Sequence, residues 1–124
     1  MRSLPVSLFH QWLWAVYLLA LITASLLPVH LPQTVDHGDK VMHILAYALL
    51  VLTWPGDWIS SRAVRFGLAG GLGLVLEIGQ GVLPTGRFMD CWDALANALG
   101  AGLGLAGRQV LACIVLDRTP GRQP

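Results

Sequence analysis

The chain has 124 residues, of which 55% are hydrophobic and only 12% charged, and its formal net charge is +1. An ordinary soluble domain carries roughly 25% charged residues, so this composition favours a protein of the lipid bilayer. The near-neutral charge, with no basic stripe along the chain, excludes a nucleic-acid-binding protein.

The first predicted element is an uncharged apolar segment, 12–29, which the prolines Pro28 and Pro32 bring to an end. Its apolar run is longer than the core of a typical signal peptide, and only Arg2 charges the residues before it. We therefore interpret the segment as a membrane span and not as a cleaved leader.

The second predicted span, 41–54, is short for a bilayer. At 1.5 Å per residue it extends about 21 Å, against a hydrocarbon core of about 30 Å. Asp39, Lys40 and His43 are therefore expected at or inside the membrane boundary, unless the bilayer thins there.

The third and fourth predicted spans, 63–83 and 91–116, are rich in small residues. Glu77 and Gln80 lie near the end of the third span. The fourth includes Arg108, which we expect to reach toward the far membrane surface or to turn the last segment into an interfacial helix.

The four segments form one predicted domain, because no internal repeat or linker separates them. The sequence therefore predicts a single all-α domain over 1–124, an integral membrane bundle of about four transmembrane helices. The two cysteines, Cys91 and Cys113, stand about 33 Å apart on the last helix and cannot form a disulfide with each other.

Basic residues near the predicted span ends indicate the orientation in the membrane. Lys40 and Arg87 fall on one side of the predicted bilayer, and both termini on the other. With the termini expected in the cytoplasm, the loops that carry Lys40 and Arg87 face outward. The basic residues on the cytoplasmic side are Arg2, Arg62, Arg65, Arg118 and Arg122.

Polar residues from three predicted helices gather at the outer end. On the fourth helix Asp90, Asp93 and Asn97 share a face about 60° wide, which we expect to point into the bundle toward Glu77 and His43. The same helix carries a ladder of small residues that permits close helix approach, namely Ala96, Gly100 and Gly104.

The combined pattern resembles the VanZ-like family of small bacterial membrane proteins. It consists of Asp39-Lys40-x-x-His43 with Ala46-Tyr47, then Glu77-x-x-Gln80, then Arg87-x-x-Asp90-x-x-Asp93-x-x-x-Asn97-x-x-Gly100. The resemblance runs from Asp39 to Gly104. Because the family name comes from a member associated with resistance to the glycopeptide antibiotic teicoplanin, it implies a protein of the cell envelope in the bacterial inner membrane, but no established reaction.

Two functions fit the outer polar residues. The first, which we favour, is binding of an anionic envelope lipid or a glycopeptide-type antibiotic, with Lys40 and Arg87 as cationic contacts. The alternative is an enzyme that acts on a lipid-linked phosphate, with His43, Glu77 and Asp93 as candidate acid and base. No Ser or Cys nucleophile stands beside a base. The candidate ligand-binding residues are Asp39, Lys40, Tyr47, Gln80, Arg87, Asp90 and Asn97.

Structural roles remain open for the same residues. Glu77 could be paired with Arg87, His43 could bond to a neighbouring helix, and Asp90 could cap the fourth helix. The set His43, Glu77 and Asp93 lacks a diagnostic ligand spacing, so we expect neither a metal nor a cofactor. Five tryptophans are predicted to anchor the membrane interfaces: Trp12, Trp14, Trp54, Trp58 and Trp92.

Membrane lipids are the expected partners, and a homo-oligomer is a further expectation. Two glycine pairs could bring helices together, Gly67 with Gly71 or Gly100 with Gly104. The sequence does not select between contacts within one chain and contacts between chains.

Overall fold

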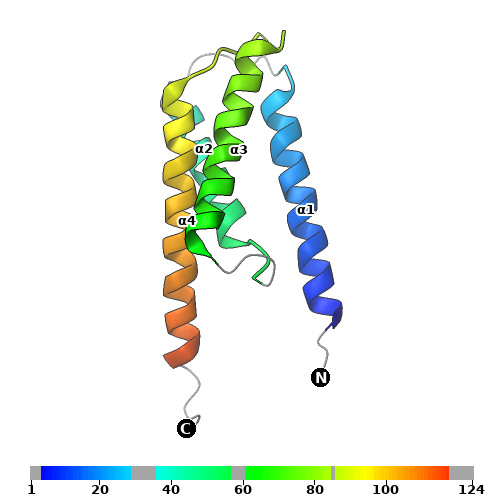
Figure 1. The fold of residues 1–124 in the computed structure, drawn as a ribbon, viewed down its shortest axis with the longest axis vertical. Helices are drawn as coiled ribbons and strands as arrows, with labels where there is room; N and C mark the ends of the chain where they lie inside the picture. Colours follow the sequence, from blue (N-terminus) through cyan, green and yellow to red (C-terminus); the bar gives the residue numbers. More distant parts are fainter. Residues whose placement is uncertain (1–3, 29–35, 57–60, 85, 118–124) are drawn as a thin grey trace.

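The computed structural model describes residues 4–28, 36–56, 61–84 and 86–117. In this part of the chain the fold is all-helical, with four helices that run alternately up and down (Figure 1). They are α1 (Leu4–Leu26), α2 (Asp36–Leu52), α3 (Arg62–Val82) and α4 (Cys91–Asp117). The start of α1 and the end of α4 lie at the same end of the bundle (Figure 1).

Prolines determine where the first two helices begin and end. Helix α1 begins earlier than predicted, because Pro5 is tolerated in a first helical turn, and it ends before Pro28. Helix α2 ends at Leu52 and not at Trp54, since the residue before Pro55 is disfavoured in the α conformation.

Capping residues determine where α3 and α4 begin. The hydroxyl oxygen of Ser61 accepts a hydrogen bond from the backbone N–H of Val64, 3.4 Å away, at the start of α3. The Asp90 carboxylate accepts one from the backbone N–H of Trp92, at 2.8 Å, just before α4 begins. The structure thus confirms the predicted capping role of Asp90.

The closest helix contact joins α2 to α4. A Cβ atom added at Gly100 would collide with the backbone carbonyl of Ile44, and one added at Gly104 would lie 2.5 Å from the carbonyl oxygen of Ala48. These two glycines therefore let the backbones of α2 and α4 touch within one chain. An added Cβ at Gly67 or Gly71 of α3 would meet nothing within 4 Å.

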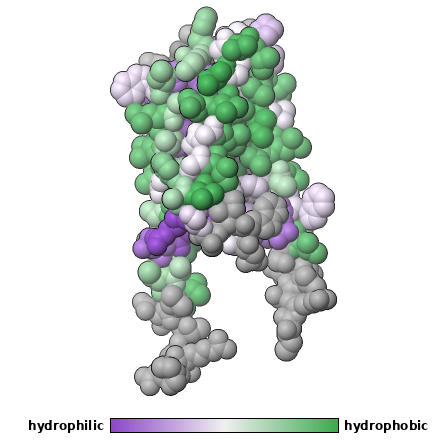
Figure 2. All heavy atoms as spheres, viewed as in Figure 1, coloured by the Kyte–Doolittle hydropathy of each residue, from purple (hydrophilic) through white to green (hydrophobic). Residues whose placement is uncertain are grey.

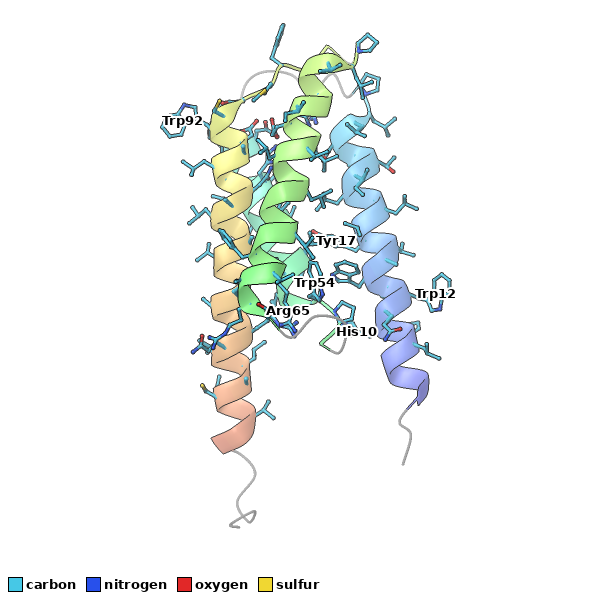
Figure 3. The ribbon with its side chains drawn as sticks, in the orientation of Figure 1. His10, Trp12, Tyr17, Trp54, Arg65 and Trp92 are labelled. Atoms are coloured by element: carbon cyan, nitrogen blue, oxygen red, sulfur yellow. The ribbon has the colours of Figure 1, made fainter. Side chains whose placement is uncertain are left out.

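The prediction that all the tryptophans anchor the membrane interfaces is wrong for Trp14 and Trp54. Both are buried, with their rings packed 4.8 Å apart between centroids, and the Trp14 indole donates to the Leu50 carbonyl at 2.9 Å. Trp12 and Trp92 instead point outward at opposite ends of the bundle (Figure 3). Trp58 lies outside the described residues.

Arg108 binds the end of another helix. Helix α4 continues through it to Asp117 as one helix. The Arg108 guanidinium donates to the carbonyls of Leu52 and Trp54, at 3.0 and 2.6 Å. Arg108 therefore binds carbonyls that the last turn of α2 leaves without helical partners.

Two helical segments, Leu8–Leu26 and Cys91–Val115, are long and apolar enough to cross a membrane. A buried core helix or an N-terminal signal sequence can meet the same criterion, but only a minor share of each segment is buried in the bundle. The other two predicted spans, now α2 and α3, do not meet it. Helix α2 has only 17 residues, and α3 carries Arg65 and Glu77 among many glycines.

Substitution of Gly100 by alanine is expected to lower the thermal unfolding temperature of the detergent-purified protein. The new Cβ would enter the space of the Ile44 carbonyl, and overpacking of this kind costs about 1–3 kcal/mol. Gly71→Ala is the matched control, because it adds the same methyl group where nothing lies within 4 Å. Equal unfolding temperatures for the two variants would contradict this account of the α2–α4 contact.

Candidate functional site

The predicted polar residues converge at the end of the bundle away from the termini. We call this group the polar cluster. Helix α2 contributes residues near its start, α3 near its end and α4 in its first turns, because these helices alternate in direction. The segment just before α4 adds Arg87 and Asp90. The members of the polar cluster are Asp39, Lys40, His43, Glu77, Gln80, Arg87, Asp90, Asp93 and Asn97.

His43 lies at the centre of the polar cluster. Its Nδ1 atom is 2.8 Å from Oδ1 of Asn97. Nε2 lies 3.8 Å from Asp39 Oδ1 and 3.9 Å from Asp93 Oδ2. The His43 ring is thus held between the Asn97 amide on one side and two carboxylates on the other.

Lys40 bridges two carboxylates of α4. Its Nζ lies 3.6 Å from Asp90 Oδ2 and 3.7 Å from Asp93 Oδ1. The Lys40 side chain is 33% exposed and that of Asp90 40%, whereas that of Asp93 is only 11% exposed. Lys40 therefore joins the outer, solvent-accessible part of the polar cluster to its buried part.

Arg87 and Gln80 both reach α1. The Arg87 guanidinium and the Gln80 amide donate to the backbone carbonyl of Ser25, at 3.2 and 2.8 Å. That carbonyl lies in the last turn of α1, where carbonyl groups lack helical partners and cations are favoured by the helix dipole. These two residues therefore hold the end of α1 against α3. The role of Ser25 was not predicted from the sequence, because a backbone carbonyl leaves no pattern in it.

Glu77 is buried, with 1% of its surface exposed. Its Oε2 accepts a hydrogen bond from the backbone N–H of Asp90 at 3.4 Å. We expected Glu77 to contact Asp93 and Asn97 directly or through water. The structure ties Glu77 to the start of α4 through the Asp90 backbone, while Asn97 packs against Gly73, one turn earlier on α3.

Tyr47 lies in the hydrophobic core and not at the surface of the polar cluster. It is 2% exposed and packs with core residues that include Trp14 and Leu50. Its hydroxyl forms no hydrogen bond to the described residues.

Three residues of the polar cluster have the chemistry of metal ligands. One ligand atom each from Asp39, His43 and Asp93 can be chosen so that all three lie within 4.8 Å of one another. The set considered from the sequence was His43, Glu77 and Asp93. In the structure Asp39, and not Glu77, joins His43 and Asp93. A cation there would have to tolerate the positive charge of Lys40 beside Asp93.

Two buried atoms of the polar cluster form no hydrogen bond with the described residues. They are Asp93 Oδ1 and Asn97 Nδ2. Lys40 lies within ion-pair distance of Asp93 Oδ1. Buried polar groups are nearly always hydrogen-bonded, and exceptions often mark functional sites. The arrangement is suited to polar binding around Asp93 and to proton transfer at His43 Nε2.

Comparison with family models, with curated proteins and with solved structures finds no match to this chain.

Loss of the Asp93 carboxylate or the Arg87 guanidinium is expected to destabilise the protein more than loss of Lys40. Asp93→Ala would deprive His43 and Lys40 of a buried partner, and Arg87→Ala would remove a donor from the Ser25 carbonyl. Each change should cost about 1–3 kcal/mol.

Lys40→Ala should cost less than about 1 kcal/mol, because its ion pairs are partly exposed. Thermal unfolding of the three variants in one detergent makes the comparison. A larger loss for Lys40→Ala than for the other two would show that the buried contacts are not the stabilising ones.

Proposed function

We propose that this chain is a four-span protein of the bacterial inner membrane, with the VanZ-like family as its relatives. Its surface supports this proposal. Large apolar side chains are exposed on all four helices, among them Leu19, Leu45, Val75 and Leu103. Figure 2 shows hydrophobic residues covering most of the visible face of the bundle. Exposed apolar area of this extent is unfavourable in water and suited to lipid.

The short helix α2 also fits such a bundle. Its 17 residues extend about 25 Å, somewhat less than a hydrocarbon core of about 30 Å. Its polar start, with Asp39 and Lys40, then falls at the membrane boundary. The buried polar side chains of α3 and α4 face the bundle interior, which is where polar residues are tolerated in membrane proteins.

The termini are proposed to lie in the cytoplasm. Arg62, Arg65 and Arg108 belong to the end of the bundle that carries the termini, whereas Lys40 and Arg87 belong to the opposite end. This asymmetry agrees with the positive-inside rule. The other arginines used in the sequence argument, Arg2, Arg118 and Arg122, lie outside the described residues.

Thiol labelling in intact cells tests the orientation. Cys91 and Cys113 are both free and exposed, and they lie far apart along α4. In single-cysteine variants, Cys91→Ser and Cys113→Ser, a membrane-impermeant reagent should label Cys91 more readily than Cys113. Preferential labelling of Cys113 would reverse the proposed topology.

The function that the geometry supports best is binding of a polar lipid headgroup at the polar cluster. The observation that carries this proposal is the unused capacity of Asp93 Oδ1, beside the partly exposed Lys40 and Asp90. Lys40 and Asp90 form the partly exposed mouth of the cluster. A headgroup that reaches this mouth can bind these side chains and Asp93 through its own polar groups.

The charges of the polar cluster limit which kind of headgroup can bind there. Three carboxylates, those of Asp39, Asp90 and Asp93, surround the ammonium of Lys40 and the ring of His43. Carboxylates thus outnumber cations at the mouth, so a purely anionic ligand would be repelled. An envelope lipid or glycopeptide that carries an amine or hydroxyl groups beside its acidic group fits the polar cluster better than a purely anionic ligand. Its amine or hydroxyl groups would donate to the carboxylates of the protein, and its acidic group would contact Lys40.

Acid–base catalysis is the second candidate function, and the position of His43 favours it. The His43 ring is held between the Asn97 amide and two carboxylates, and an imidazole can take up a proton from water or a substrate hydroxyl. Asp39 and Asp93 would stabilise the resulting imidazolium. A lipid-linked phosphate is the substrate class that combines membrane access with hydrolytic chemistry.

Incubation of the purified protein with total bacterial lipid extract separates the two functions. Mass spectrometry should detect a lipid that remains with the protein, unchanged if the polar cluster only binds and altered if it catalyses. His43→Ala should abolish any turnover, and Asp93→Asn should reduce retention roughly tenfold, since one charge-assisted contact is lost.

Thr53→Val is the control variant. It removes a hydroxyl that donates to the Leu49 carbonyl of its own helix, away from the polar cluster. It should leave retention and turnover unchanged. Equal retention by the wild type, Asp93→Asn and His43→Ala would contradict a headgroup site at the polar cluster.

A further inference from the structure

A hollow of about 320 Å³ lies at the end of the bundle that carries the termini, between the start of α3 and the second half of α4. It is an open depression of the surface and not an enclosed cavity. Three arginines dominate it, two from α3 and one from α4, and Figure 3 shows Arg65 at this level. The residues that line the hollow are Arg62, Arg65, Leu105, Arg108, Gln109 and Ala112.

All three arginines bind only neutral acceptors in the described part of the chain. Arg62 donates to the side-chain oxygen of Gln109 at 2.9 Å, and Arg65 to the carbonyl of Gly56 at 3.2 Å. Arg108 donates to two carbonyls at the end of α2. None of the three forms an ion pair with a described carboxylate. Within the described residues, three positive charges therefore share one hollow without a carboxylate paired to any of them.

Arg65 is the least expected of the three. It is only 7% exposed, and its Nε has no hydrogen-bond partner in the described chain. A buried, unpaired guanidinium is unfavourable, because the charge has lost its hydration and gained no counter-charge. One of its N–H groups donates to the carbonyl of Gly56, in the turn that follows α2, and the guanidinium has other N–H groups that can donate to a further acceptor.

We propose that this arginine hollow binds a phosphate group. Guanidinium groups present paired N–H donors that match phosphate oxygens, and three around one hollow would surround the group. Arg62, which is exposed, forms the entrance, and the buried Arg65 forms the inner wall. The phosphate belongs either to the headgroup of an anionic lipid or to a soluble phosphate. A basic hollow between helices at the cytoplasmic side of a membrane is typical of lipid headgroup sites.

This site is separate from the polar cluster in position and in charge. The polar cluster lies at the opposite end of the bundle and has an excess of carboxylates. Variants in one group therefore leave the other intact, and the two proposals can fail independently.

Two binding measurements on the full-length protein in detergent test the proposal. Native mass spectrometry compares retention of phosphatidylglycerol with that of phosphatidylcholine. Thermal unfolding in sodium phosphate is compared with that in sodium chloride at the same ionic strength. The variants are Arg62→Gln and Arg65→Gln, and Thr53→Val is the control, because its hydroxyl donates to the Leu49 carbonyl and it lines neither the arginine hollow nor the polar cluster.

Selective retention of phosphatidylglycerol, reduced about tenfold or more by Arg62→Gln but not by Thr53→Val, would support a lipid headgroup site. Stabilisation by phosphate that Arg62→Gln removes, without selective lipid retention, would support a soluble phosphate. Arg62 is exposed, so its variant remains informative even if Arg65→Gln does not fold. No preference for either phosphate probe, or equal losses in Arg62→Gln and Thr53→Val, would overturn the proposal.

Discussion

The backbone contact between α2 and α4 is the constraint on which the rest of the structure depends. Gly100 and Gly104 leave no side chain between the two helices, so the carbonyls of Ile44 and Ala48 lie directly against α4. At this separation His43 reaches Asn97, and Lys40 reaches Asp90 and Asp93. A larger residue at either glycine would separate the helices and lengthen every one of these contacts.

Polar groups collect at both ends of an otherwise apolar bundle, and the two ends are chemically different. At the polar cluster, carboxylates outnumber the cations around them, and His43 lies between two of them. At the arginine hollow, the positive charges of Arg62, Arg65 and Arg108 have only neutral acceptors among the described residues. Between the ends, the core holds Trp14 and Trp54 with aliphatic neighbours. The two ends thus differ in the charge that they present.

Several features were predictable because they are local. The four helices follow from runs of apolar residues that prolines and caps interrupt, and the shared face of Asp90, Asp93 and Asn97 follows from 3.6 residues per turn. Other features were not predictable. Trp14 and Trp54 stand near the ends of their apolar runs, as interface anchors do, and only the approach of α1 to α2 turns them into a buried pair. Arg108 binds carbonyls of another helix, which no spacing in the sequence indicates.

The sequence by itself determined the helical class, the approximate helix boundaries and the side of each helix that is polar, because these depend on residues close together in the chain. It also indicated that His43, Asp93 and Asn97 would meet, since alternating helices bring these positions to one end. Only the tertiary structure decided which partner each group takes. Arg87 and Gln80 bind the Ser25 carbonyl, and Tyr47 enters the core, because these contacts depend on distances between helices and on backbone atoms that are the same in every residue.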